Sequence, residues 1–226
     1  MPTGTFVLFD IVRFPDTRRP IRTEPRRPRG SRDEEADPVF TELRFTRQDT
    51  VAGFEVARVT HRRGVHVEGF WHGTPITQFV EQKVFNAFFR LDDRALIAHT
   101  KKEIALAAAD ALCDEFSEVL ELRNVELDFG QIIPIAINVI GSWFKGMRYT
   151  NIRSEAAFGS QINRDPEFLR MSRLGNHSNL VVVMNFGGEQ IEVNLSRDGS
   201  AFFMGDYPVD VCLRFVIDLR RYRVTP

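Results

Sequence analysis

The chain has 226 residues, of which 43% are hydrophobic and 27% charged, a composition typical of a globular protein with a buried core. Its formal net charge is −1, so no overall field attracts it to nucleic acid or to an anionic membrane. The longest apolar run, residues 132–140, is too short for a membrane span. We therefore expect a cytoplasmic protein with no membrane segment, in which any attraction to polyanions comes from a local patch.

Arginine dominates the cations. Only Lys83, Lys101, Lys102 and Lys145 are lysines among the 30 basic residues. A GC-rich genome explains this bias and suggests a prokaryotic source, whereas the alternative is that guanidinium groups are needed to recognise phosphates or carboxylates. The two cysteines form no CxxC pair for zinc or redox chemistry, which fits a reducing compartment.

The first hundred residues show patterns of β-strands. Aromatic and β-branched runs, or alternation of apolar and polar residues, predict strands over 5–14, 39–45, 52–62 and 64–73. Arg62 and Arg63 would lie in the turn between the last two strands. A further hairpin, over 83–100, would turn at Asp92 and Asp93.

A helix over 101–120 follows this hairpin. Thr100 and Glu103 have the spacing of a capping box, in which each side chain accepts a hydrogen bond from the backbone of the other. Apolar residues at helical spacing form one stripe along the helix. These residues are Ile104, Ala108, Leu112, Phe116 and Val119.

The second half of the chain alternates strands and helices. We expect strands at 122–129 and 147–158, a helix or helical turn at 131–146, a short helix at 165–174, a three-stranded meander at 179–205 and a final helix at 206–222. Asp165 and Asp206 would cap the two last helices. The fold class is α+β. It would comprise two small curved antiparallel-sheet units, 1–121 and 122–226, each closed by an amphipathic helix.

Residues 16–38 are unlike the rest of the chain. They hold seven arginines and four prolines and end in an acidic run. Proline keeps such a segment extended, and concentrated guanidinium groups attract phosphate. We predict that this insertion, too polar and proline-broken to pack, is a nucleic-acid-binding arm; an inert disordered insertion and a protein-docking segment are the alternatives.

The predicted nucleic-acid-binding residues are all arginines. Those in the insertion could be joined by two more from the turn near residue 63, to form one patch. They are Arg18, Arg19, Arg22, Arg26, Arg27, Arg29, Arg32, Arg62 and Arg63.

Signals for catalysis are weaker. Glu81 and Lys83 form an E-x-K pair that alternation places on one strand face, as in metal-dependent nucleases, with Glu68 as the second carboxylate ligand of Mg²⁺. The same pair is also a common surface ion pair. His66 and His72 lie about 20 Å apart on an extended strand, too far for one metal ion, so we expect no metal site there.

The sequence thus favours a non-catalytic binding protein without a cofactor. It would engage DNA, RNA or a partner subunit through the arginine-rich segment and an open sheet face. The alternatives are a metal-dependent nuclease and a structural subunit of a larger assembly or homo-oligomer.

Overall fold

The computed structural model describes residues 4–16, 18–28, 37–71, 74–146 and 154–224, with backbone alone for 47–49, 68–71 and 74–78. The fold is mixed α and β, with mostly antiparallel strands and four α-helices in these ranges, which confirms the predicted class at this level. None of the described helices combines the length and the apolar character that crossing a membrane requires. The chain divides into two compact units, residues 11–122 and residues 1–10 with 123–226.

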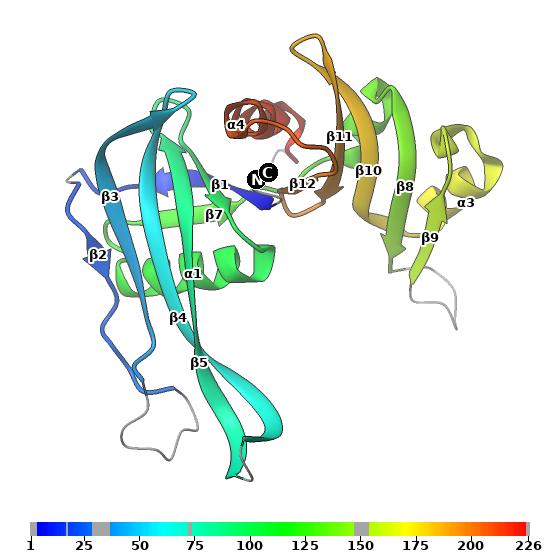
Figure 1. The fold of residues 1–226 in the computed structure, drawn as a ribbon. Helices are drawn as coiled ribbons and strands as arrows, with labels where there is room; N and C mark the ends of the chain where they lie inside the picture. Colours follow the sequence, from blue (N-terminus) through cyan, green and yellow to red (C-terminus); the bar gives the residue numbers. More distant parts are fainter. Residues whose placement is uncertain (1–3, 17, 29–36, 72–73, 147–153, 225–226) are drawn as a thin grey trace. The chain divides into compact units, whose positions relative to one another are not determined.

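The unit of residues 11–122 is built on an antiparallel sheet in the order β2–β3–β4–β5–β6 (Figure 1). Its strands are β2 (Ile21–Arg22), β3 (Phe40–Val51), β4 (Phe54–Trp71), β5 (Thr74–Arg90) and β6 (Ala95–His99). The pairing of Arg90 with Ala95 confirms the predicted hairpin at Asp92 and Asp93. The opening strand is also confirmed, as β1 (Thr5–Arg13).

β4 is one long strand where the sequence predicts two. The turn predicted at Arg62 and Arg63 is wrong, because Arg63 pairs with Glu81 and Gly64 with Val80, which keeps the ladder intact. β3 begins at Phe40, opposite Arg62. Beyond that point, β4 pairs with β5 alone among the described strands.

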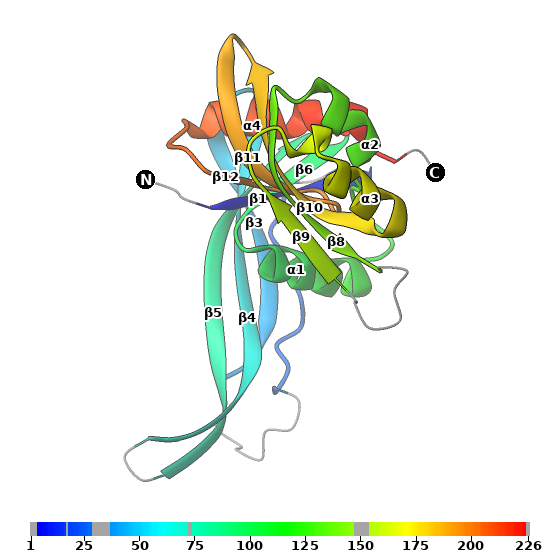
Figure 2. The same ribbon diagram turned by 90° about the vertical axis from the view of Figure 1, so that its right-hand side faces the viewer.

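Helix α1 (Lys102–Glu115) lies on one side of the long β4–β5 hairpin (Figure 2). The predicted stripe is buried at Ile104, Ala108 and Leu112. The predicted capping box is wrong: Lys101 is the N-cap, and no side chain caps the helix. The helix also ends at Glu115 and not at 120, because Phe116, its C-cap, leaves the helical conformation with φ −114° and ψ 32°.

The second unit has the strand order β1–β12–β11–β10–β8–β9. Its strands after β1 are β8 (Asn138–Lys145), β9 (Ser154–Phe158), β10 (Asn176–Phe186), β11 (Glu189–Ser196) and β12 (Ser200–Phe203), and β7 (Glu121–Asn124) pairs with β1. Residues 1–10 group with the C-terminal half because β1 pairs with β12. The predicted meander is confirmed, with Gly187 and Gly188 at φ of 61° and 87° in its first turn.

The helix predicted over 131–146 is wrong for most of its length. Only α2 (Phe129–Ile132) and the 3₁₀ turn η1 (Ile133–Ile135) are helical, and β8 follows. β8 is rich in β-branched and aromatic residues, which favour strands, and it pairs with β10 on one side and β9 on the other. This extra strand widens the sheet of the second unit.

Helices cover one face of this second sheet. α3 (Pro166–Leu174) begins as predicted, with Asp165 accepting a hydrogen bond from the Glu167 amide at 2.7 Å. α4 (Val209–Asp218) instead has Pro208 as its N-cap, so the predicted Asp206 cap is wrong. Ring contacts join helix and sheet, Phe168 with Phe144 at 5.6 Å and Phe215 with Phe203 at 5.6 Å. The remaining short turns are η2 (Ile162–Arg164) and η3 (Leu219–Tyr222).

Candidate functional site

The arginine-rich segment is docked on the first unit over residues 18–28. β2 pairs antiparallel with β3, and Arg26 exchanges two backbone hydrogen bonds with Val39, at 3.0 and 2.8 Å. The Thr23 hydroxyl accepts a hydrogen bond from the Thr41 amide at 2.9 Å. The expectation that this segment is too polar and proline-broken to pack is therefore wrong for residues 18–28, because an edge strand tolerates proline outside its paired positions.

Arg18 anchors the docked segment. Its guanidinium makes two hydrogen bonds to the Glu55 carboxylate, at 3.1 and 3.2 Å. It also lies 5.2 to 5.7 Å from the centroids of Phe14, Phe45 and Phe89, within the range of cation–π attraction. These contacts give Arg18 a structural role in the fold.

The other described arginines of the segment divide into two groups, those with a described partner in the fold and those without one. Arg22 stacks on Phe40, with its guanidinium 3.9 Å from the ring centroid, and Arg26 pairs with Glu115 at 2.9 Å. Arg19 and Arg27 are exposed and form no hydrogen bond or ion pair with another described side chain. Arg29 and Arg32 lie outside the described residues.

Arginines from β2, β3 and β4 meet on one face of the sheet. In the strand ladder, Arg22 of β2 lies opposite Glu42 of β3. Likewise, Phe40 and Arg44 of β3 lie opposite Arg62 and Arg58 of β4. Because side chains alternate between the two faces of a strand, all of these point to the same side of the sheet. We call this surface the arginine face. It comprises Arg22, Arg44, Arg58 and Arg62, with Phe40 between the first and the last.

The charges on the arginine face are only partly balanced. Arg44 and Arg58 are directly opposite one another in the ladder, an arrangement that opposes folding. Arg44 pairs with Glu42 at 3.1 Å, and Arg62 with Asp37 at 3.1 Å. Arg58 is exposed and forms no hydrogen bond or ion pair with another described side chain, so the four guanidinium groups of this face are paired with two described carboxylates.

Arg62 and Arg63 do not extend one patch, contrary to prediction. They are successive residues of β4 and therefore point to opposite faces. Arg62 joins the arginine face and lies 5.6 Å from the Phe40 centroid. Arg63 joins the face that α1 partly covers, where it pairs with Glu81 at 2.9 Å.

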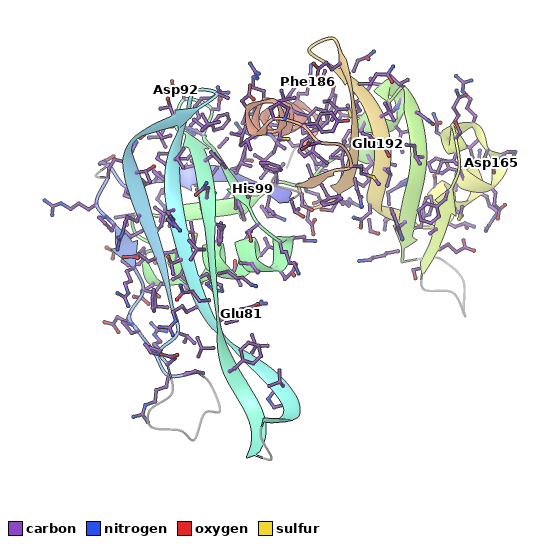
Figure 3. All side chains as sticks on the ribbon, viewed as in Figure 1. Glu81, Asp92, His99, Asp165, Phe186 and Glu192 are labelled. Atoms are coloured by element: carbon purple, nitrogen blue, oxygen red, sulfur yellow. The ribbon has the colours of Figure 1, made fainter. Side chains whose placement is uncertain are left out.

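The E-x-K pair lies on that second face, with Glu81 near the middle of β5 and the turn residue Asp92 beyond the end of the strand (Figure 3). Lys83 occupies one Glu81 oxygen at 2.7 Å, and Arg63 occupies the other. Hydrogen bonds from Lys83 and then Arg63 lower the pKa of Glu81. Both carboxylate oxygens are thus engaged by cations, as in a surface ion pair.

The described residues contain no cluster of three or more histidine, cysteine, aspartate or glutamate side chains suited to a metal ion. The backbone of Glu68 lies at a register shift between His66 and Gly69, but its side chain is outside the described set, as is His72. Nothing among the described side chains supplies the second carboxylate that the nuclease interpretation requires.

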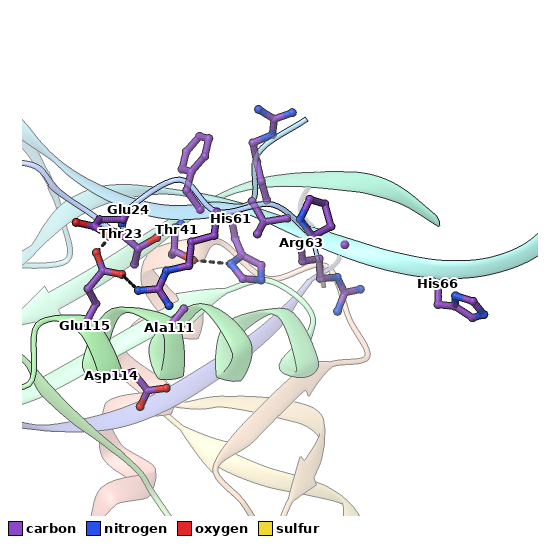
Figure 4. A pocket seen from close by; sticks show the side chains of 15 residues that line it. Thr23, Glu24, Thr41, His61, Arg63, His66, Ala111, Asp114 and Glu115 are labelled. Atoms are coloured by element: carbon purple, nitrogen blue, oxygen red, sulfur yellow. Dashed lines mark hydrogen bonds and ion pairs between the residues drawn. The ribbon is translucent and has the colours of Figure 1, made fainter. Parts of the chain in front are cut away.

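A cavity of about 610 Å³ lies beside Glu115 of α1, at the level of Thr23 and Thr41 (Figure 4). His61 lines it and is only 5% exposed. Its Nδ1 is 2.8 Å from Thr41 Oγ1, while Nε2 has no hydrogen-bond partner among the described residues. His66 lies farther along β4, apart from these groups (Figure 4).

The environment of His61 does not activate a nucleophile. Burial, followed by the charge of Arg63, lowers the pKa of His61, and Glu81 acts in the opposite direction. The imidazole is therefore neutral at pH 7. Its hydroxyl partner, Thr41, is only 1% exposed. The cavity fits a structural or binding role better than catalysis.

A second hydroxyl–imidazole pair lies in the other unit. Ser142 Oγ is 2.8 Å from His177 Nδ1 and donates to the Asn179 carbonyl at 3.0 Å. Its proton is therefore directed away from the imidazole, and Ser142 is fully buried. Burial, the main cause, and the positive charge of Arg197, the second, lower the pKa of His177 to about 4. This pair stabilises the core.

No protein-family model matches the chain, and no curated protein shows significant sequence similarity to it.

The sequence interpretation missed Arg44 and Arg58, the two central residues of the arginine face. Alternation within 39–45 and 52–62 gives the face of each residue, but the register that brings them opposite one another is a property of the paired strands. Thr41 and His61 were also missed, because a buried polar pair leaves no spacing motif in the sequence.

Proposed function

We propose that this protein is a non-catalytic binding protein that engages nucleic acid through the arginine face. The opposed pair of Arg44 and Arg58 carries the proposal. Like charges opposite one another destabilise a sheet, whereas a phosphate bound between them would turn their repulsion into shared attraction.

The dimensions of the arginine face suit a phosphate backbone. Strands lie about 4.8 Å apart and rise about 3.3 Å per residue, so the face extends roughly 10 Å across β2 to β4 and roughly 13 Å from Arg58 to Arg62. Several phosphates of one strand fit this area. Stacking on Phe40 holds Arg22 and Arg62 in place before the ligand arrives, which reduces the entropy lost on binding.

The exposed Arg19 and Arg27 add charge outside the arginine face and would contribute to binding without selecting a sequence. We also propose that the protein is cytoplasmic and of prokaryotic origin, and that its two units are curved sheets, each closed by a helix. No observation on the described residues favours the nuclease or the purely structural alternative over it.

The test is fluorescence polarisation with labelled single-stranded and duplex oligonucleotides, of DNA and of RNA, at low salt. Arg44→Ser combined with Arg58→Ser is expected to weaken binding at least about tenfold. The matched control is Arg173→Ser combined with Arg214→Ser, which removes the same charge from α3 and α4.

The proposal is contradicted if the wild-type protein binds none of these oligonucleotides, or if the control variant loses as much affinity as the variant of the arginine face. A protein partner or self-association would then be the function to examine, by sedimentation of the intact chain.

A further inference from the structure

The sheet of the second unit also has an open face, and it is aromatic. One side of β8 to β12 is buried under α3 and α4, with Phe144, Leu180 and Leu195 fully enclosed. On the other side, Phe158 is 61% exposed and Phe202 is 40% exposed. Exposed large rings on an uncovered sheet are unusual in a soluble domain and mark a binding surface.

The strand register aligns these rings. Phe158, Gly141, Val181, Asn194 and Phe202 are successive cross-strand partners, so they form one row across β9, β8, β10, β11 and β12. The adjoining row on the same side contains Trp143 and Asn179. We call this surface, formed by Trp143, Phe158, Phe202, Asn179 and Asn194, the aromatic face.

Gly141 shapes the aromatic face. A Cβ atom at this position would lie 2.8 Å from the ring of Phe158, so the absence of a side chain lets that ring lie over β8. Trp143 meets Phe158 edge to face, with ring centroids 4.8 Å apart. The two rings therefore fix one another and leave surface for a third ring to stack.

Polar groups lie beside the rings. A cavity of about 300 Å³ is lined by Trp143, Lys145, Asn179 and Asn194. Asn194 Oδ1 is buried and has no hydrogen-bond partner among the described residues, an arrangement that a ligand with an N–H donor would satisfy. Lys145 is exposed and supplies a cation next to the indole.

We propose that the aromatic face binds unstacked bases of single-stranded nucleic acid. Trp143, Phe158 and Phe202 stack the bases, the amides of Asn179 and Asn194 meet their polar edges, and Lys145 contacts the phosphate between them. The combination of ring, amide and cation matches the three parts of a nucleotide. This inference rests on the proposed function and extends it, since it makes single strands the preferred ligand.

The chain offers a specific probe, because Trp71 and Trp143 are its only tryptophans. In a Trp71→Phe background, Trp143 alone reports its surroundings. Titration with a labelled oligothymidine is expected to quench Trp143 fluorescence at the same concentrations that raise polarisation. Phe158→Ser, at the most exposed ring, is expected to weaken single-strand binding about five- to tenfold and to leave blunt-duplex binding unchanged.

Leu169→Ser is the matched control, since Leu169 is 45% exposed on α3 and lies away from the aromatic face. It is expected to bind like the wild type. Unchanged Trp143 fluorescence at saturating oligonucleotide, or equal losses for single strand and duplex in Phe158→Ser, would overturn the inference.

Failure here is separable from failure of the proposed function. Binding that depends on Arg44 and Arg58 but not on Phe158 would contradict the role of the aromatic face and leave the proposed function standing. Absence of any oligonucleotide binding would contradict both the proposed function and this inference. If a neutral oligosaccharide quenched Trp143 instead, the aromatic face would be a carbohydrate-binding surface.

Discussion

The two open sheet faces of this protein differ in what they present to solvent. The arginine face carries four guanidinium groups, of which Arg44 and Arg58 oppose one another, whereas the aromatic face carries three rings and two amides. The former suits a phosphate backbone of any sequence, and the latter suits bases that have left a duplex. The difference lies in the chemistry of each face, charge on one and aromatic rings with amides on the other, so each face is tested by its own variants.

The largest expected effect concerns the segment that completes the arginine face. Arg18→Ala removes the paired hydrogen bonds to Glu55 and the contacts with three phenyl rings, and should lower the free energy of unfolding by about 2 kcal/mol. Urea denaturation measures this change. Arg19→Ala, at the exposed neighbour, should change it by less than about 0.5 kcal/mol. Equal effects of both would mean that β2 docks without Arg18.

The next effect concerns His177, a half-buried histidine on the helix-covered side of the second sheet. The pKa of His177 is about 4, so below about pH 6.5 the unfolded chain binds a proton that the folded chain does not. Its stabilising contribution is complete above pH 6.5 and is lost as the pH falls through 4. Allowing for partial solvent screening, we expect a loss of about 1–2 kcal/mol in urea unfolding between pH 7 and pH 4.

His177→Phe should flatten this pH dependence, because a phenyl ring fits among Phe129, Phe144 and Phe168 without titrating. His66→Gln, at an exposed histidine, serves as the control and should keep the wild-type profile. An unchanged profile in His177→Phe would assign the acid sensitivity to other groups.

A smaller effect distinguishes the two faces of the first sheet. Arg58→Thr relieves the repulsion with Arg44 and should raise the free energy of unfolding by about 0.2–1 kcal/mol while weakening oligonucleotide binding. Lys83→Thr, on the opposite face, removes the ion pair with Glu81 and should lower the free energy of unfolding by roughly a few tenths of a kcal/mol. A loss of stability in Arg58→Thr would show that Arg58 has a structural partner.

The smallest expected effect is on oligonucleotide integrity. Because Lys83 and Arg63 engage both oxygens of Glu81, Mg²⁺ or Mn²⁺ should produce no cleavage in either the wild type or Glu81→Ala. Gel electrophoresis after long incubation measures this outcome. Cleavage that Glu81→Ala abolishes would establish the nuclease instead.

The sequence predicted the strands whose patterns are local. The opening strand, the hairpin at Asp92 and the meander at Gly187 all follow from alternation and turn residues. β8 was mistaken for a helix because a short apolar run has no decisive period, and Pro134 lies just before the strand. The predicted capping box of α1 is wrong because the amides of Ile104 and Ala105 donate hydrogen bonds to the backbone carbonyl of Lys101, and this closes the first turn without the side chain of Thr100.

The candidate sites depend on register, which the sequence does not contain. Arg22 was predicted as a binding residue, yet its place beside Arg62 follows from the pairing of β2 with β3. Likewise, the alignment of Phe158 with Phe202 passes through five strands. Electrostatic reasoning on the segment alone could not show that Arg18 and Arg26 have partners within the fold.

The most direct test of the central claim is the salt dependence of single-strand binding. Each phosphate contact contributes about 0.7 to the slope of log affinity against log salt for single strands. The wild type should show a steep negative slope, and Arg44→Ser with Arg58→Ser should make it shallower by about 1.4. An identical slope in both proteins would contradict phosphate binding by the arginine face.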